Sequence, residues 1–493
     1  MNAKGTLGLG SAVSTGVGLI IATSCLIMLG QGTGVVGVSF ILPMALAVGL
    51  NMITAASICE LNGLMPNLTG GLAQYTLAGM GPFPSLVSMI GGYLFCNSLT
   101  ASAEGVVFGT AVHAVTGINS TVCSLVITVI LIIVCLNGVD MFAKVQNIVA
   151  IGLIGSMGLM GIIGALGLGT SAKVAQPLFV LTNLKDILPF TAMAFWLFIG
   201  VEFVIPIAKD MKNPRKHVPQ SLFLSLGIIF ILQSLLALGF HNYVPWVDLA
   251  ASTTPHLLYG INTLGTLGLI WMAIVAVCAS ISTLNTVINS LSQICYGMAK
   301  LNMLPAFFLK TNKKNACVWG VLTFGGAIFF IQLFIGIASA NNPTAGDISF
   351  LVLTGSVFWM ISYLLTHVNV LKLRRQLPKA PRSFRAPTVL IFVGIAGSVY
   401  MIFNVSTNPS TYIVAGVAFV VLGVYSFLWI KYRMKIPVFK AVPVEKVMAT
   451  ENELYYITHV LRPRERLARE KQLENHPGSQ PKKQEKEQKQ DET

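Results

Sequence analysis

Long apolar segments alternate with short polar connections along most of this 493-residue chain. A helix needs about 20 apolar residues to cross the ~30 Å hydrocarbon core of a bilayer. Twelve segments qualify, and each is predicted to be a membrane-spanning helix. They cover residues 6–29, 36–59, 83–113, 119–138, 145–168, 188–208, 219–240, 262–298, 317–337, 348–371, 388–405 and 411–430. The third and eighth are long enough to tilt or to project beyond the membrane.

The composition agrees with this pattern. Hydrophobic residues make up 54% of the chain and charged residues only 10%, and the mean hydropathy is +0.74. These values far exceed those of a soluble protein of the same length. The predicted fold class is therefore an all-α polytopic membrane protein.

Lys and Arg residues divide the connections into a basic set of sixteen and an opposite set holding only Lys173 and Lys185. By the positive-inside rule, the N- and C-termini and all basic connections are expected to be cytoplasmic, in a multi-pass protein of the plasma or inner membrane. The net charge of +14 thus reflects topology and not nucleic-acid binding, and the basic connections should contact anionic lipid headgroups. The basic set is Lys4, Lys144, Lys209, Lys212, Arg215, Lys216, Lys300, Lys310, Lys313, Lys314, Lys372, Arg374, Arg375, Lys379, Arg382 and Arg385.

No sequence pattern indicates an enzyme, a cofactor or a metal site. The eight cysteines include no Cys-x-x-Cys pair, and the histidines are not clustered. No segment presents a Ser/His/Asp set or a glycine loop that could cradle phosphate. We therefore predict no catalytic residues, no cofactor and no metal.

Two apolar segments contain residues that weaken a regular helix. The first holds glycines and hydroxyl side chains between Ser14 and Cys25, and the sixth holds a glycine beside an acid at residues 196–202. Gly16, Gly18 and Gly200 are the predicted helix breaks. Interrupted helices at matching positions of two halves are typical of inverted-repeat transporters with a midplane site, and close helix packing at small residues is the alternative.

Polar side chains form a stripe on each of two predicted helices. Spacings of four, three and four residues place the members of each stripe on one helical face. The stripes are Tyr93, Asn97, Thr100 and Glu104 in the third segment, and Ser282, Thr286, Asn289 and Gln293 in the eighth. Such faces should point into a cavity or the interior of a bundle, and simple hydrogen bonding between helices remains the alternative.

Two carboxylates, Glu104 and Glu202, lie within apolar segments that hold no Lys, Arg or His deep enough to neutralise them. An acid at such a position is costly to insert and usually faces water, a partner or a transported species. Two interior acids without an interior base favour a basic or neutral substrate over an acidic one. For Glu104, a protonated and purely structural side chain is the alternative.

Four motifs carry a resemblance to a known family. The chain resembles the amino acid, polyamine and organocation (APC) permeases, most closely the basic amino acid antiporters of the arginine/agmatine type, over nearly all of residues 6–430. The motifs are Trp196-Leu-Phe-Ile-Gly-Val-Glu202, Lys212-Asn-Pro-Arg-Lys-His-Val-Pro219, Glu60-Leu-x-x-x-x-Pro66-x-x-x-Gly-Gly-x-x-x-Tyr75 and Tyr296-Gly-Met-Ala-Lys-x-x-x-Leu-Pro305.

The resemblance implies two inverted five-helix repeats at residues 1–170 and 171–372, two further helices at 373–432, and a cytoplasmic, partly disordered tail at 433–493. It implies alternating access around the broken first and sixth helices, and a homodimer is a family-level expectation. The implied substrate site comprises amides of Ala22, Thr23 and Ser24 for a carboxylate, carbonyls near Ile20, Trp196 and Ile199 for an amine, and Thr100 and Gly200. Trp196 resembles a gate over the substrate, and Glu202 matches an acid tied to gating and proton-linked change.

The chain also departs from the family. The first-helix Gly-Ser-Gly of relatives is Ala22-Thr23-Ser24 here, and Val287 and Thr100 replace the tryptophan and asparagine that shape an arginine pocket. No lysine occurs in the fifth segment, where several proton-dependent relatives place one, and the matching position is near Leu153. A sodium site using Ser282 or Thr283 is left open as the alternative to proton coupling.

The sequence thus predicts a secondary active transporter for an amino acid or amine, coupled by exchange or to protons. Glu202 is the predicted coupling and gating acid, and Glu104 either binds the cationic end of the substrate or is a second proton site. The alternatives are a sodium-coupled symporter and a transport-incompetent sensor of the same fold, with the tail as its output. No nucleic-acid partner is predicted.

Overall fold

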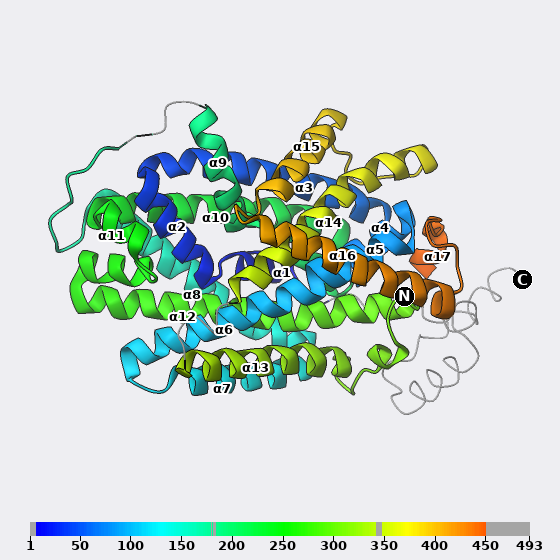
Figure 1. The fold of residues 1–493 in the computed structure, drawn as a ribbon, viewed down its shortest axis with the longest axis horizontal. Helices are drawn as coiled ribbons and strands as arrows, with labels where there is room; N and C mark the ends of the chain where they lie inside the picture. Colours follow the sequence, from blue (N-terminus) through cyan, green and yellow to red (C-terminus); the bar gives the residue numbers. More distant parts are fainter. Residues whose placement is uncertain (1–5, 179, 181–183, 342–347, 450–493) are drawn as a thin grey trace, which may run out of the picture.

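The computed structural model describes residues 6–178, 180, 184–341 and 348–449. Within that part of the chain the regular elements are helices, and most run along the long axis of the molecule (Figure 1). Most of the tail predicted at 433–493, from residue 450 onward, lies outside the described residues.

The helices follow the apolar pattern of the sequence. Up to residue 170 the chain contains α1 (Leu9–Ile20), α2 (Thr23–Val36), α3 (Ile41–Leu64), α4 (Leu72–Met80), α5 (Pro82–Ser88), the π-helix η2 (Met89–Phe95), α6 (Cys96–Thr116), α7 (Ser120–Leu136) and α8 (Val139–Leu166). The rest comprises α9 (Leu184–Phe195), the 3-10 helices η3 (Trp196–Phe198) and η4 (Val201–Asp210), α10 (Pro214–Tyr243), α11 (Trp246–Ala251), α12 (Pro255–Lys300), α13 (Val318–Asn341), α14 (Ser349–Gln376), α15 (Thr388–Asn404), α16 (Pro409–Trp429) and α17 (Val444–Met448).

Nine described helices are long and apolar enough to cross a membrane, and the bent pair α1 and α2 makes a tenth span. Two shorter apolar helices, α7 and α15, occupy the positions of the fourth and eleventh predicted spans. The all-helical membrane fold is therefore confirmed. The count of twelve spans and the division into two inverted repeats of five stay predictions.

The first span breaks at a different residue from the one predicted. Helix α1 continues through Gly16 and Gly18 to Ile20, and α2 begins at Thr23 with a bend of 57° between them. The assignment of these two glycines as helix breaks was wrong, because they permit close packing instead. A Cβ on Gly18 would lie 1.7 Å from the Gln146 amide nitrogen.

The sixth span breaks where the sequence predicts. Helix α9 and the short η3 end before Gly200, whose φ of 109° lies in the left-handed region that favours glycine. The chain then continues as η4, so the two halves of this span are joined by extended and left-handed residues.

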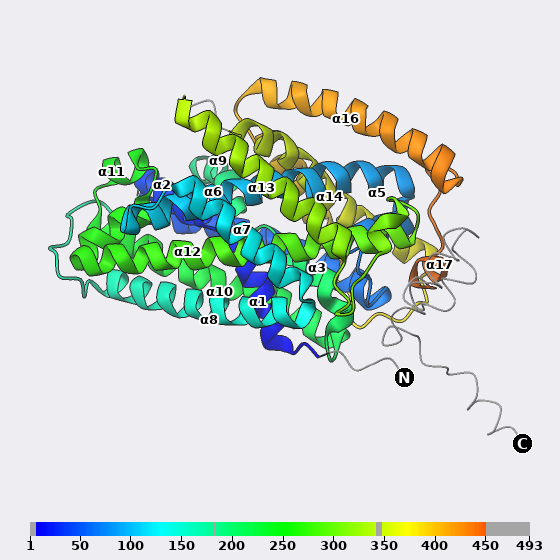
Figure 2. The same ribbon diagram turned by 90° about the horizontal axis from the view of Figure 1, so that it is seen from below.

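Helix α12, which is kinked at Leu264 and Gly265, runs the length of the molecule and contacts α1, α2, α6 and α8 (Figure 1). Helix α16 lies at the periphery beside α14 and α5 (Figures 1 and 2). The outer helices carry exposed apolar side chains, such as Val417 and Val420 on α16. The two broken spans pack against the other helices of the bundle, so their unpaired backbone groups are kept from lipid.

Candidate functional site

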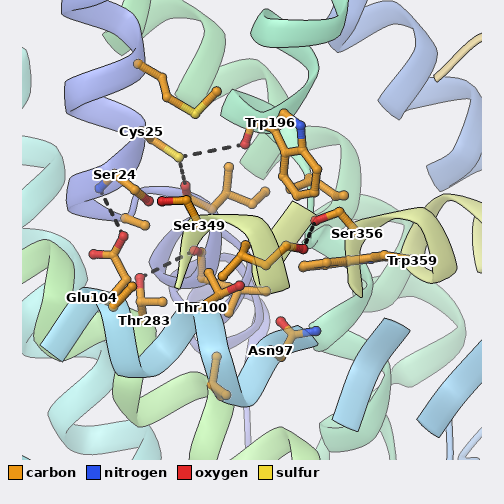
Figure 3. A pocket seen from close by; sticks show the side chains of 18 of the residues that line it. Ser24, Cys25, Asn97, Thr100, Glu104, Trp196, Thr283, Ser349, Ser356 and Trp359 are labelled. Atoms are coloured by element: carbon orange, nitrogen blue, oxygen red, sulfur yellow. Dashed lines mark hydrogen bonds between the residues drawn. The ribbon is translucent and has the colours of Figure 1, made fainter. Parts of the chain in front are cut away.

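A cavity of about 340 Å³ lies where the two broken spans meet α6, α12 and α14. Two indole rings, Trp196 and Trp359, form part of its wall, and the remaining wall is mainly aliphatic. Figure 3 shows Ser24 and Glu104 on one side of this cavity and the two tryptophans on the other. The polar lining residues are Ser24, Asn97, Thr100, Glu104, Thr283, Ser349 and Ser356. A concave, mostly apolar space with a few convergent polar groups is typical of a small-molecule site.

The first amides of α2 bind a carboxylate of the protein itself. The Thr23 N–H donates to Glu104 Oε2 at 2.9 Å, and the Ser24 N–H donates to Glu104 Oε1 at 3.0 Å. The Ala22 N–H donates to the Ile20 carbonyl at 2.9 Å. The three amides that the resemblance implies for a substrate carboxylate therefore all have acceptors, and two of them share the 1% exposed Glu104.

Side chains of α2 and α12 hold this carboxylate in place. The Thr23 hydroxyl donates to the Ala276 carbonyl at 2.9 Å and lies 2.9 Å from the Ser280 hydroxyl. The Ser280 hydroxyl in turn donates to Glu104 Oε2 at 3.5 Å. Glu104, which lies on α6, thus accepts hydrogen bonds from two other helices, α2 and α12.

Cys25 links the two helix breaks. Its thiol lies 3.1 Å from the Ile20 carbonyl and 3.7 Å from the Trp196 carbonyl, which are two of the carbonyls predicted to face a substrate amine (Figure 3). Ile199, the third, lines the cavity.

Glu202 accepts three hydrogen bonds in an aromatic cluster beside the cavity. Oε1 accepts from the Tyr93 hydroxyl at 2.6 Å and from the Trp359 indole N–H at 2.8 Å, and Oε2 accepts from the Tyr363 hydroxyl at 2.7 Å. The Tyr363 oxygen also accepts from the Gly200 N–H at 3.3 Å. Since Trp359 lines the cavity, one side chain joins this acid to the candidate binding space.

The two hydroxyls considered for a sodium site, of Ser282 and Thr283, already have hydrogen-bond partners on α8 and α1. The Gln146 amide nitrogen donates to the Ser14 carbonyl at 3.0 Å and to the Ser282 hydroxyl at 2.7 Å. The Thr283 hydroxyl donates to the carbonyls of Gly18 and Leu19 at 3.3 and 3.4 Å. A neutral amide therefore lies between α1 and α12.

The structure brings most predicted site residues together. Those that line the cavity are Ile20, Ala22, Ser24, Thr100, Glu104, Trp196, Ile199 and Thr283. Those that lie outside the lining are Thr23, Gly200, Glu202 and Ser282, each bonded to a neighbour as described above, and the two glycines of α1.

The sequence interpretation missed the contribution of α14. Ser349, Ser356 and Trp359 line the cavity, and Tyr363 binds Glu202. Their spacing of seven, three and four residues marks one helical face, so the same test that found the stripe on α6 could have found them.

A family model described as amino acid permease matches residues 6–429. The chain belongs to the amino acid permease family. This membership confirms the resemblance to the amino acid permeases.

Two named relatives match about half of the chain. The putrescine transporter PotE of Haemophilus influenzae is 25% identical over 50% of this chain and 55% of its own length. The uncharacterized amino acid permease YecA of Bacillus subtilis is 27% identical over 42% and 49%, respectively. The chain thus spans about half the length of these relatives. The branched-chain amino acid permease BcaP of B. subtilis is 21% identical over 80% of this chain and 86% of its own length.

Solved transporters share the fold of this permease at low identity. A manganese transporter of Eremococcus coleocola has a TM-score of 0.56 at 14% identity, covering 86% of this chain and 94% of that one. A Na+-coupled sialic acid symporter also gives 0.56, at 12% identity over 81% and 89%. These similarities concern the fold alone.

Proposed function

We propose that this permease is a secondary active transporter that moves an amino acid or a small amine by alternating access, coupled by exchange or to protons. Trp196, Ile20, Ile199 and the start of α2 form the substrate space. Glu202 is the titrating group. The family membership, the transporter fold and the cavity between the broken spans support this proposal.

The observation that carries the coupling proposal is the contact between Glu202 and Trp359. The indole N–H of Trp359 donates to Glu202, while the residue itself lines the cavity. A change in the charge of Glu202 alters the strength of this bond, so proton binding and the shape of the cavity wall are linked through one side chain.

The pairing of Gln146 favours protons over sodium as the coupling ion. Sodium needs several oxygen ligands, whereas Ser282 faces the amide nitrogen of Gln146 at 2.7 Å. The Gln146 oxygen accepts from the Asn285 side chain at 3.1 Å, which fixes the amide with its nitrogen toward Ser282.

The test is uptake of a labelled amino acid and amine panel into proteoliposomes. Vesicles are preloaded or empty, with or without an inward proton gradient, and sodium is replaced by choline in a parallel set. Stimulation by internal substrate identifies exchange, and gradient-driven uptake into empty vesicles identifies proton symport. Binding without flux under all conditions identifies the sensor alternative, and a requirement for sodium contradicts the proton proposal.

Replacing Glu202 by Gln tests the titrating group. We expect Glu202→Gln to flatten the pH dependence of transport and to leave the melting temperature close to that of the parent. The amide oxygen can still accept from Tyr93 and Trp359, and the amide nitrogen can donate to the Tyr363 hydroxyl oxygen. Tyr93→Phe is the matched control, since it removes one donor and keeps the acid. A pH profile of Glu202→Gln equal to that of the parent would exclude Glu202 from coupling.

A further inference from the structure

We infer that the substrate of this permease is an aliphatic amine without an α-carboxylate, and that Glu104 takes the place of the carboxylate an amino acid would bring. The inference rests on the proposed transport function, because it concerns the same cavity. It follows from the contacts of Glu104, from the charge of the cavity lining and from the shape of the remaining wall.

The contacts of Glu104 fill the anion-binding positions at the start of α2. The two amides that open this 14-residue helix each donate to one oxygen of the same carboxylate, at 2.9 and 3.0 Å. Helix N-termini favour negative charge, so this is the place in the cavity best suited to an anion. Glu104 comes from α6, 80 residues further along the chain, and serves as a built-in anion there.

A substrate carboxylate would have to displace Glu104 to reach these amides. Displacement would break two charge-assisted hydrogen bonds, together with the contact to Ser280 at 3.5 Å. It would also leave the Glu104 side chain without those donors in a mostly aliphatic wall. An amino acid could therefore gain hydrogen bonds from the Thr23 and Ser24 amides only if Glu104 first lost them.

The charge of the cavity selects for a cation. Of the described residues that line it, Glu104 carries an ionisable acid group, and none is Lys, Arg or His. A substrate ammonium can donate hydrogen bonds to the remaining lone pairs of the Glu104 carboxylate, whereas a substrate carboxylate would be repelled by its negative charge. Electrostatic complementarity thus favours an amine over a zwitterion.

The rest of the cavity wall suits an alkyl chain and a second ammonium. Leu19, Met28 and Val352 provide aliphatic surface around the cavity. On the side away from Glu104, the Trp196 and Trp359 rings meet edge to face with centroids 6.1 Å apart (Figure 3). An indole face attracts a cation. Since Glu104 and the two tryptophans lie on different sides of the cavity (Figure 3), a diamine can place one ammonium at each side.

Matched pairs of compounds test this inference in the unmodified protein. Proteoliposomes are loaded with one compound of a pair and assayed for exchange against the labelled form of the same compound. The pairs are 1,4-diaminobutane with ornithine, 1,5-diaminopentane with lysine, and agmatine with arginine, because each pair differs by the α-carboxylate alone. We expect the amine of each pair to exchange with at least a tenfold lower half-saturation concentration.

The outcomes separate the inference from the function on which it rests. If amino acids exchange as well as or better than their amines, the transporter stands and the amine inference is overturned. If no compound of a broad panel exchanges or is taken up in a proton gradient, and binding is nevertheless detected, both the transport function and the inference fall. Exchange of amines with the expected preference supports both.

Glu104→Ala provides a second test with a gain of binding. Removing the carboxylate leaves the Thr23 and Ser24 amides available, so the preference for the amine over its parent amino acid should fall at least tenfold. Glu445→Gln, which neutralises an exposed acid on α17, is the matched control and should keep the preference of the parent. An unchanged preference in a folded Glu104→Ala protein would overturn the inference. If this variant fails to fold, the compound pairs remain decisive.

Discussion

At the scale of single residues, Trp359 connects two parts of the site that the sequence suggests separately. Its N–H binds Glu202, and its ring lies near Trp196, Tyr93 and Phe203, at centroid distances of 6.1, 5.6 and 6.1 Å. A substrate that displaces the Trp359 ring would also move the indole N–H that donates to the buried Glu202. Glu202, the proposed coupling residue, and Trp196, a proposed substrate-binding residue, thus both contact the Trp359 indole.

Trp359→Phe should separate these two roles. Phenylalanine keeps an aromatic wall but removes one of the three donors to the charged form of Glu202. A hydrogen bond to a charged group contributes about 1.5–3 kcal/mol, so we expect the midpoint of the pH profile of transport to rise by roughly one pH unit or more. Trp429→Phe is the control, because the Trp429 N–H donates to the Asn302 carbonyl far from the cavity. Equal midpoints in Trp359→Phe and the parent would contradict this role.

At the scale of helices, the broken first span depends on a tight fit against its neighbours. Gly18 lies on α1 where the Gln146 amide and the Ser282 hydroxyl approach, and an added Cβ would lie 1.7 and 2.1 Å from them. The same helix contains Gly10, around which no atom lies within 4 Å of an added Cβ. The two positions therefore form a matched pair for packing.

Gly18→Ala should destabilise the permease, and Gly10→Ala should not. Overpacking a tight contact typically costs about 1–3 kcal/mol, and here it would also push Gln146 away from Ser282. Gly10→Ala replaces glycine by a better helix former in open space, so we expect an unchanged or higher melting temperature. Thermal unfolding in detergent measures both, and equal melting temperatures would contradict the packing role of Gly18.

The helices show which parts of the site can be predicted from sequence. The stripe of Asn97, Thr100 and Glu104 on α6 was predicted because helical spacing alone places these side chains on one face. The break of the first span was predicted three or more residues too early. A glycine in the sequence can mark either a helix break or a place where two helices pack closely, and Gly16 and Gly18 are of the second kind. The pairing of Glu104 with Ser24 joins residues 80 positions apart, and no local pattern encodes such a contact.

At the scale of the whole molecule, backbone hydrogen bonds join the segment before α1 to the end of η4. Leu7, before α1, exchanges backbone hydrogen bonds with the end of η4: its N–H donates to the Asp210 carbonyl at 3.0 Å, and its carbonyl accepts from the Lys212 N–H at 2.9 Å. Helices α1 and η4 both pack on α12. In the proposed alternating-access cycle, we therefore expect α1 and η4 to move together relative to α12.

The polar stripe on α12 continues beyond the cavity toward the end of the helix at Lys300. Within the described part of the chain, the Thr286 hydroxyl, the Asn289 amide nitrogen and the Gln293 carbonyl oxygen are buried without a hydrogen-bond partner. An unpaired buried polar group costs about 1–3 kcal/mol. A transporter tolerates this cost if the same groups are hydrated in the other state of its cycle.

Cysteine labelling at Asn289 tests whether this stripe becomes hydrated during transport. In a background with the eight native cysteines replaced, Asn289→Cys should react with a hydrophilic thiol reagent applied from the side of α17, because alternating access exposes the stripe to water in one state. Cycling with substrate on both sides should change the labelling rate several-fold. Ile288→Cys, which starts from a fully buried aliphatic neighbour on the same helix, should stay unreactive. Equal and substrate-independent labelling of both positions would contradict a pathway along α12. Labelling of Asn289→Cys alone would support a water-filled pathway between α12 and the paired α1 and η4.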